Sequence, residues 1–179
     1  TRLRVMLARG RRLDVLAQWD FIECHLGLRR SLGAVARAEY VCDLADVFTV
    51  EEEPCAQAFD LTAETLNCLN ASAIRGDSGW AEKLVAAYEL QLLTERGYGL
   101  SLQRCAHCGQ EIGSEAARAG LQFSPAAGGL LCRRCRYAFR DGIAVSAAVV
   151  GAMRALSSVP PGSVHEIALS APTQAKVGD

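Results

Sequence analysis

The chain has 179 residues, of which 50% are hydrophobic and 22% are charged, so it is long enough to bury a core and is not a disordered protein. No apolar run approaches the roughly 20 residues that span a bilayer, and the N-terminus lacks the basic head and apolar stretch of an export signal. Without export, the eight cysteines favour metal ligation or buried thiols over disulfides, and we expect a cytoplasmic protein.

The net charge of −1 hides a strong segregation of charge along the chain. Residues 1–38 hold eight arginines against three acidic residues, residues 39–95 hold twelve acidic against two basic residues, and residues 96–154 again hold eight arginines against three acidic residues. The guanidinium group of arginine can bind phosphate through two parallel hydrogen bonds. The pattern favours two basic ends that bind a polyanion and an acidic middle that binds another partner. Two solvent-exposed faces whose opposite charges only cancel would give the same numbers of basic and acidic residues.

Residues 1–26 predict two β-strands joined by a basic turn. Arginine alternates with Leu3, Val5 and Leu7 in the first strand, and apolar residues occupy alternate positions of the second, over residues 13–26. A two-stranded ribbon is marginal by itself, and nothing else supplies a strand partner before the helices begin. We therefore expect these residues to belong to a β-domain whose earlier strands are absent.

Helical periodicity begins at Leu28, where apolar residues recur about every fourth position and predict one buried stripe. The run Glu51–Pro54 is predicted to open the next helix, because acidic residues and proline suit a first turn. The buried faces predicted for the two helices are Leu28, Leu32, Ala36, Tyr40, Leu44, Val47 and Phe48, and then Phe59, Ala63, Leu66, Leu69, Ala73 and Ile74.

A third helix is predicted to begin at an N-cap, Asp77 or Ser78, and to end at Gly97. A last helix begins near Ser146, and the tail after it is predicted to hold one short strand, Val164–Leu169. The inward residues predicted for these two helices are Trp80, Leu84, Ala87, Tyr88 and Leu92, and then Val149, Met153 and Leu156.

Two Cys-x-x-Cys pairs are the strongest functional signal: Cys105, Cys108, Cys132 and Cys135. Two residues between cysteines let a tight turn point both sulfurs at one metal, and Gly109 suits the positive φ that such a turn often needs. Residues 121–131 predict a hairpin that carries the second pair back to the first. We therefore predict one structural Zn²⁺ held by the four cysteines, with no open position for catalysis.

The remaining candidates do not form a catalytic group. His107 lies inside the first pair, but four thiolates already complete a tetrahedron, so it is not expected to bind the metal. No phosphate-binding loop or nucleophile motif is present, and we predict that the chain is not an enzyme. The isolated cysteines, which we expect to be packing residues, are Cys24, Cys42, Cys55 and Cys68.

Arginines interleaved with Tyr137 and Phe139 follow the second cysteine pair. A basic platform with aromatic side chains suits contact with a nucleic-acid backbone and stacking on bases, although the same arginines could instead only offset the charge of the thiolates. The residues predicted to bind DNA are Arg133, Arg134, Arg136 and Arg140, together with Arg2, Arg4, Arg9, Arg11 and Arg12 of the N-terminal strands.

An ordered set of features runs from about Arg2 to Leu156. In chain order they are the basic strands, Leu28-Arg29-Arg30-Ser31-Leu32, a helix that ends near Phe48, the acidic run before Pro54, Phe59, Tyr88-Glu89-Leu90-Gln91-Leu92-Leu93, Gly97-Tyr98, Leu102, the first cysteine pair, Phe123-Ser124, Gly128-Gly129-Leu130-Leu131 and the second cysteine pair. Together they resemble the RecO family of recombination mediator proteins. The specific part is the position of the cysteine pairs after Gly97-Tyr98, and a departure is Leu100, near where the family has a proline.

The resemblance implies a mainly α fold: a helical bundle with a four-cysteine, zinc-ribbon-like hairpin, preceded by the closing strands of an incomplete OB-fold β-barrel. The domains it implies are residues 1–26 for the OB-fold strands, 27–100 for the helical domain, 101–140 for the zinc-binding insertion, 141–159 for the final helix and 160–179 for an extended tail.

The resemblance also implies a function in DNA repair. Members of the family bind single- and double-stranded DNA, anneal complementary strands, and act with RecR and single-strand-binding protein to load RecA. We therefore expect a non-enzymatic recombination mediator that is cytoplasmic and associated with the nucleoid. The alternative is a zinc-stabilised adaptor between proteins that does not touch DNA, and titration with labelled single-stranded DNA at low salt separates the two.

Overall fold

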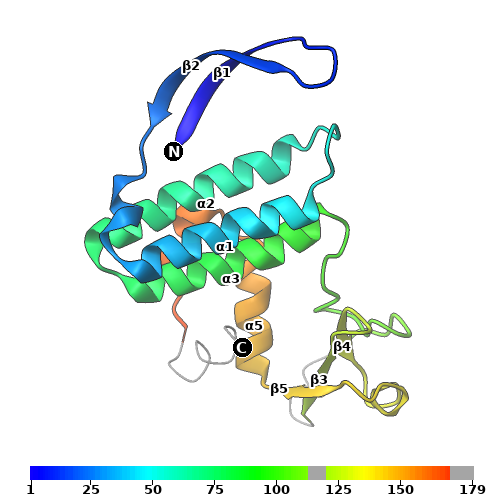
Figure 1. Cartoon of the computed structure of the whole chain (residues 1–179). Coiled ribbons are helices and arrows are strands. Elements are labelled where there is room, and N and C mark those ends of the chain that lie inside the picture. The colour runs from blue at the N-terminus through cyan, green and yellow to red at the C-terminus, as the bar shows by residue number, and fades with distance from the viewer. Residues whose placement is uncertain (113–119, 170–179) are drawn as a thin grey trace.

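The structure is a computed structural model that describes residues 1–112 and 120–169. Helices make up most of its regular structure, so the fold is mainly α, as predicted. Figure 1 shows a β-hairpin at one end, a group of helices in the middle, and a small sheet at the other end. Among the described residues, no helix has the length and apolar character needed to cross a membrane.

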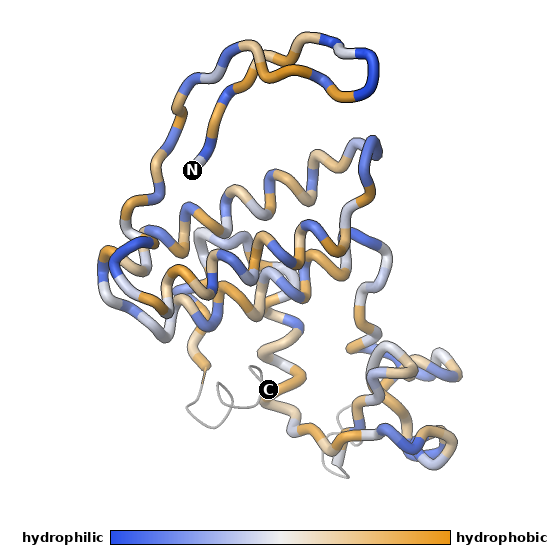
Figure 2. The backbone as a smooth tube through the Cα atoms, viewed as in Figure 1, coloured by the Kyte–Doolittle hydropathy of each residue, from blue (hydrophilic) through white to orange (hydrophobic). Residues whose placement is uncertain are grey.

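The N-terminal hairpin consists of β1 (Arg2–Ala8) and β2 (Val15–Glu23), which pair antiparallel and confirm the two predicted strands. Apolar and polar residues alternate over the first half of β1 and the second half of β2, and apolar residues run consecutively in the other halves (Figure 2). Trp19 and Phe21 are both exposed, and their rings meet edge to face with centroids 4.9 Å apart. The hairpin therefore presents an apolar face that none of the described helices covers.

A short 3₁₀ helix, η1 (Leu26–Arg30), joins this hairpin to the helices. His25, just before η1, is buried, and its Nε2 lies 2.5 Å from Oδ1 of Asn67 in the second long helix. This contact anchors the end of the hairpin to the helical body. The predicted start of the first long helix at Leu28 is wrong, because Leu28 belongs to η1.

Helix α1 (Leu32–Phe48) begins after Ser31, whose hydroxyl accepts a hydrogen bond from the Ala34 N–H at 3.2 Å. A serine at this position satisfies one of the free N–H groups of a first turn. The cap therefore sets the start of the helix four residues later than the apolar periodicity indicates.

The buried stripe predicted for α1 is wrong in phase. A step of four residues turns an α-helix by about 400°, so strict four-residue spacing drifts by about 40° per step and leaves the buried face. Val41 is fully buried, and Leu44 and Phe48 pack against the core as predicted. The members of the predicted stripe that are exposed are Leu32, Ala36, Tyr40 and Val47.

Helix α2 (Ala56–Arg75) begins after the acidic run rather than within it, so the prediction that Glu51–Pro54 opens this helix is wrong. Leu69 lies in the core as predicted, but Phe59 and Ile74 are 60% and 55% exposed. The buried face instead includes Ala58, Thr65 and Ser72. Small and polar residues supply much of this face, so an apolar periodicity does not reveal it.

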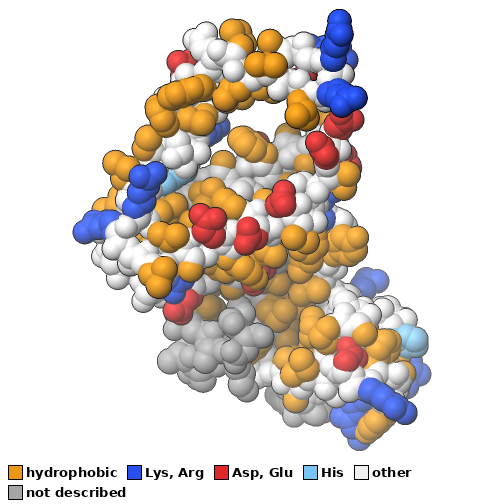
Figure 3. Space-filling model, viewed as in Figure 1, with side chains coloured by type: hydrophobic (Ala, Val, Ile, Leu, Met, Phe, Trp, Pro, Cys, Tyr) orange, Lys and Arg blue, Asp and Glu red, His pale blue; other side chains and the backbone are white. Residues whose placement is uncertain are grey.

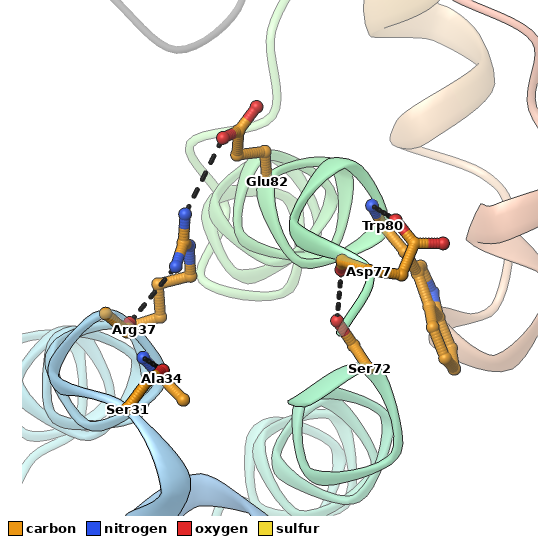
Figure 4. Close-up of polar contacts among 8 residues, drawn as sticks. Ser31, Ala34, Arg37, Ser72, Asp77, Trp80 and Glu82 are labelled. Carbon is orange, nitrogen blue, oxygen red and sulfur yellow. Dashed lines mark hydrogen bonds and ion pairs between the residues drawn. The ribbon is translucent and has the colours of Figure 1, made fainter. Parts of the chain in front are cut away.

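The turn between α2 and α3 (Ser78–Glu95) forms as predicted. Gly76 ends α2 with φ 72°, and the Asp77 side chain caps α3 by accepting from the Trp80 N–H at 2.9 Å. The Ser72 hydroxyl donates to the Asp77 carbonyl at 2.6 Å (Figure 4). Figure 4 also shows Arg37 of α1 reaching toward Glu82 of α3, an ion pair of 3.6 Å.

The core lies among α1, α2, α3 and α5 (Ala147–Leu156). The inward face predicted for α3 is confirmed, since all five of its residues are buried: Trp80, Leu84, Ala87, Tyr88 and Leu92. For α5, the Ser146 hydroxyl caps the helix, Val149 and Leu156 are buried, and Met153 is half-buried. The small sheet attaches to the body through α5.

The strand predicted at Val164–Leu169 is wrong, because the chain there forms a 3₁₀ helix, η3 (Pro161–Glu166). Val164 is fully buried against the helices, and Lys83 donates to the Ile167 carbonyl at 2.6 Å. The segment thus packs on the helical body and pairs with no described strand. The rest of the predicted tail, residues 170–179, lies outside the described residues.

The small sheet contains β3 (Leu121–Ser124), β4 (Gly129–Leu131) and β5 (Ile143–Val145), in the order β4-β3-β5. The hairpin β3–β4 is the predicted one, and β5 adds an antiparallel strand on the other side of β3. Leu102, Leu130 and Val150 form a small buried cluster that joins this sheet to α5. The cysteine pairs are therefore fixed to the helical body.

Candidate metal centre and basic patch

The first cysteine pair lies in a tight turn, Cys105–Gln110, here called the first knuckle. The Cys105 N–H donates to the Gln110 carbonyl at 2.8 Å, and the Gly109 N–H donates to the Cys105 carbonyl at 2.9 Å. Gly109 has φ 73°, the positive value that the sequence predicts and that glycine adopts without strain. The knuckle turns both cysteines toward the same side.

The second cysteine pair lies in the turn Cys132–Arg136, here called the second knuckle. The N–H groups of Cys135 and Arg136 both donate to the Cys132 carbonyl at 3.0 Å. The Ala106 N–H of the first knuckle donates to the Leu130 carbonyl in β4, at 2.8 Å. This bond aligns the first knuckle with the strand that leads into the second, so the two knuckles face each other.

The four sulfur atoms of Cys105, Cys108, Cys132 and Cys135 all lie within 4.8 Å of one another. The Sγ atoms of Cys108 and Cys132 are 3.8 Å apart. Zinc–sulfur bonds of about 2.3 Å in a tetrahedron require sulfur separations of about 3.8 Å, whereas a disulfide requires about 2.05 Å. The four cysteines could therefore hold one metal ion, and all eight cysteines of the chain are free thiols.

The thiols differ in how easily they ionise. Burial raises the pKa of Cys105, but the N–H groups of Cys132, Cys108 and His107 outweigh it and lower that pKa to about 6. Burial, together with hydrogen bonding to the Cys132 thiol, raises the pKa of Cys135 to about 12. Negative charges this close repel one another, so the four thiols ionise together only with a cation among them.

Apolar side chains surround the inner side of the cluster. Cys105 is 2% exposed and Cys132 9% exposed, and both pack with Leu131. His107 is not among the residues that converge. Its ring lies edge-on against Phe139, with the ring centroids 5.5 Å apart.

The four isolated cysteines do not share one environment. Cys55 and Cys68 are half-buried, whereas Cys24 and Cys42 are exposed. The predicted packing role is therefore wrong for Cys24 and Cys42. Cys24 lies in the link between β2 and η1, and Cys42 follows the buried Val41, so it lies off the buried face of α1.

The second knuckle and the residues after it carry a basic patch, defined as Arg133, Arg134, Arg136 and Arg140. Arg133, Arg134 and Arg140 are exposed, and the Arg134 guanidinium donates to the Gln110 side chain at 3.2 Å across the two knuckles. Within residues 1–112 and 120–169, no carboxylate pairs with any of the four. Figure 3 shows basic side chains gathered on this end of the molecule. Their charge is therefore available to a partner.

Arg104, just before the first knuckle, differs from the basic patch. Its guanidinium forms an ion pair with Glu111 at 3.2 Å, across the base of the knuckle. Its charge is therefore already partnered.

The second predicted set of basic residues lies on the N-terminal hairpin. All five of its arginines are exposed: Arg2, Arg4, Arg9, Arg11 and Arg12. Figure 1 places the β1–β2 hairpin and the small sheet at opposite ends of the molecule, with α1, α2 and α3 between them. The two basic segments therefore form two separate surfaces.

Acidic side chains lie on the helices between the two basic ends. In Figure 3 they follow α1 across the front of the molecule. The hydroxyl of Tyr40, on α1, donates to the carboxylate of Glu89, on α3, at 2.5 Å. This bond raises the pKa of Tyr40 to about 12. The segregation of charge along the sequence is thus also a segregation in space.

Two contacts that hold the cysteine hairpin were not predicted from the sequence. The Asp141 carboxylate accepts hydrogen bonds from the Ser124 hydroxyl at 2.8 Å and from the Ala126 N–H at 2.7 Å. The Arg154 Nε of α5 donates to the Leu102 carbonyl at 3.0 Å. An Asp near a turn is a weak signal for the first contact, and no local pattern indicates the second, which joins residues 52 apart.

Two hollows lie near these features. A groove of about 1000 Å³ separates the helices from the first knuckle and is lined by Phe48, Tyr98 and Phe123, among others. A cleft of about 140 Å³ lies beside the start of α1, next to Arg37 and Asp77. The polar groups of the cleft bond locally (Figure 4), since Asp77 caps α3 and Arg37 pairs with Glu82.

The fold and the cysteine cluster together define a mainly helical protein that carries a potential four-cysteine metal centre beside a basic patch. The family model described as "Recombination protein O C terminal" matches residues 29–179. The chain therefore belongs to the RecO family, and the resemblance drawn from its motifs is confirmed.

Three relatives, each named DNA repair protein RecO, illustrate the match. The protein of Pelotomaculum thermopropionicum is 34% identical over 161 residues, which cover 89% of this chain and 58% of the relative. The protein of Roseiflexus sp. is 34% identical over 176 residues, which cover 98% of this chain and 59% of the relative. The protein of Desulforudis audaxviator is 33% identical over 178 residues, which cover 99% of this chain and 67% of the relative. The chain thus spans a little under three fifths of the length of the first two relatives.

Proposed function

We propose that this chain is the helical and metal-binding portion of a non-enzymatic recombination mediator in DNA repair. Its membership of the RecO family supports this, as does the naming of its relatives as DNA repair proteins. The observation that carries the proposal is the basic patch, of which Arg133, Arg134 and Arg140 are exposed, on and just after a knuckle that a metal would hold rigid. In this proposal the chain binds both single- and double-stranded DNA.

The metal in this proposal is one structural zinc held by the four cysteines. Their sulfur separations suit a tetrahedron of zinc and thiolates. Bound there, zinc would supply the positive charge that lets all four thiols ionise, and it would stabilise the hairpin, as structural zinc stabilises small domains. The cysteines close the coordination shell, so the role of the site is to hold backbone in place.

The two basic ends support strand annealing. They lie at opposite ends of the molecule with acidic helices between them (Figures 1 and 3), so one DNA strand can occupy each end without competing for the same arginines. Arginine binds phosphate regardless of base sequence. Two such surfaces on one molecule would hold two strands at the same time.

We also propose that the acidic middle serves protein partners, with RecR and single-strand-binding protein as the candidates and RecA loading as the outcome. Membership of the RecO family supports this choice of partners. Residues 1–26 would then be the closing strands of an OB-fold, which their uncovered apolar face supports. The other proposed domains are residues 27–100, 101–140, 141–159 and 160–179, and the protein would be cytoplasmic and associated with the nucleoid.

The second candidate function is an adaptor between proteins that does not contact DNA. The acidic face of α1 favours it, because such a face suits a basic protein surface. In this case the arginines of the basic patch would only balance the charge of the thiolates.

A DNA titration separates the two functions. Fluorescence anisotropy would follow a labelled single strand and a labelled duplex at several salt concentrations, with the unsubstituted chain and with Arg133→Ala/Arg134→Ala/Arg140→Ala. We expect binding that weakens with salt, and a slope of log K against log salt that falls by about 0.7 per arginine removed for the single strand. Arg29→Ala, at an exposed arginine of η1, is the control. No binding at low salt would favour the adaptor.

A further inference from the structure

Tyr137 is an exposed aromatic residue at the centre of the basic patch. It lies in the 3₁₀ turn η2 (Arg136–Ala138), which begins at the last residue of the second knuckle, and Tyr137 is 77% exposed. The Ala138 N–H donates to the Cys135 carbonyl at 3.0 Å. A cysteine of the proposed metal centre therefore holds the backbone on which the Tyr137 ring stands.

Arg136 fixes the orientation of this ring. Its guanidinium carbon lies 4.7 Å from the centroid of the Tyr137 ring, and its Nη2 donates to the Tyr137 hydroxyl. The Nε of Arg136 is buried without a hydrogen-bond partner among the described residues, so the inner part of this side chain is packed into the protein. One face of the ring is thus covered by a cation, and the other face is left for a ligand.

The neighbouring aromatic residue does not offer the same surface. Phe139 packs against the cluster formed by Cys105, Leu131 and Cys132, and the His107 ring meets it edge-on. Its ring contributes to the support of the knuckles. Of the two aromatic residues interleaved with the arginines, only Tyr137 presents most of its ring to solvent.

We propose that the free face of Tyr137 stacks on an unpaired base, so that the basic patch prefers single-stranded to duplex DNA. This inference rests on the proposed DNA-binding function and deepens it. The arginines around the ring would contact the phosphates on either side of the base, and Arg136 acts as the positioning residue. Bases inside a duplex are already stacked on their neighbours, so they cannot offer a face to the ring, whereas bases of a single strand can.

The ring adds little to the stability of the fold, which makes the proposal open to test. Little surface is removed from water at a residue 77% exposed, so Tyr137→Ala should leave the unfolding transition unchanged. Phe59→Ala, which removes a ring 60% exposed on α2, is a matched control. Tyr137→Phe keeps the stacking face and loses only the hydroxyl.

The test measures the affinity of each variant for a single strand, for a blunt duplex, and for a single strand of abasic sites. We expect Tyr137→Ala to weaken binding to the base-containing strand roughly 5- to 150-fold, the range for losing one base–aromatic stack. It should change binding to the duplex and the abasic strand less than twofold. Tyr137→Phe and Phe59→Ala should match the unsubstituted chain. A fluorescent base analogue should be quenched by the unsubstituted chain and not by Tyr137→Ala.

An equal loss for all three DNAs, or no loss for the base-containing strand, would overturn the stacking role. In either case, if Arg133→Ala/Arg134→Ala still weakens binding, the DNA-binding function stands and only the inference about Tyr137 fails. If the unsubstituted chain binds no DNA at low salt, both fail together.

Discussion

The Asp141 carboxylate lies 2.8 Å from the Ser124 hydroxyl and accepts its hydrogen bond, which ties the segment before β5 to the end of β3. The same carboxylate accepts from the Ala126 N–H, and the Ser124 oxygen accepts from the Ala127 N–H at 3.1 Å. One acidic side chain thus organises the turn that brings the two knuckles together.

Asp141→Ala should lower the melting temperature of the chain at pH 7, since it leaves these donors without their acceptor. The N–H group of Ala126 and the Ser124 hydroxyl lower the pKa of Asp141 below its usual value of 3.8. A carboxylate with a lowered pKa in the folded state contributes stability above its unfolded pKa and loses it as the pH falls through the folded pKa. The difference between the two proteins should therefore be full at pH 7 and shrink below about pH 4.

Thermal unfolding from pH 7 to pH 3 checks this, with Asp60→Ala at an exposed carboxylate of α2 as the control. A difference that stays constant over this range would show that the charge of Asp141 does not matter.

The phase of α1 can be tested by two matched substitutions on one helix. Val41 is fully buried and Val47 is 75% exposed, so Val41→Ala should cost about 1.5–3 kcal/mol of unfolding free energy and Val47→Ala less than about 0.5 kcal/mol. Both substitutions change helix propensity in the same way, so the difference isolates burial. Urea unfolding measures both, and equal costs would contradict the packing described for α1.

The bond from Arg154 to the Leu102 carbonyl should couple the cysteine hairpin to α5. Arg154→Ala removes it and should destabilise the hairpin by about 1 kcal/mol. Hydrogen exchange of the hairpin amides should accelerate, while the amides of α2 and α3 keep their protection. Uniform acceleration across the chain would mean that the hairpin and the helices unfold as one unit.

The two basic ends should contribute independently to DNA binding. Arg9→Ala/Arg11→Ala/Arg12→Ala and Arg133→Ala/Arg134→Ala alter surfaces on opposite sides of the helices (Figure 1), and distant sites that share no partner are usually additive. The combined variant should lose the sum of the two losses in binding free energy, within about 0.5 kcal/mol, on a long single strand. A strongly non-additive result would place both segments on one continuous DNA path.

The sequence predicts those parts of the fold that local patterns determine. The α3 face is predictable because large side chains such as Trp80, Leu84 and Tyr88 recur along it at helical spacing, and the convergence of the four cysteines is predictable because Cys-x-x-Cys turns are local. The phase of the first half of α1 is not predictable, because its buried side is built from Ala34, Ala38 and Val41, while the larger Leu32 faces solvent. Nor is β5, whose three residues are too few to show a period, or η3, whose shape follows from packing against the helices.

We propose that Cys105, Cys108, Cys132 and Cys135 hold one zinc ion, which keeps the basic patch rigid. Elemental analysis of the purified chain, combined with thiol titration before and after chelation, tests it most directly. We predict one zinc per chain, with four thiols that react only after the metal is removed. A chain that is folded without zinc, with all eight thiols reacting at once, would show that the four cysteines hold no metal ion.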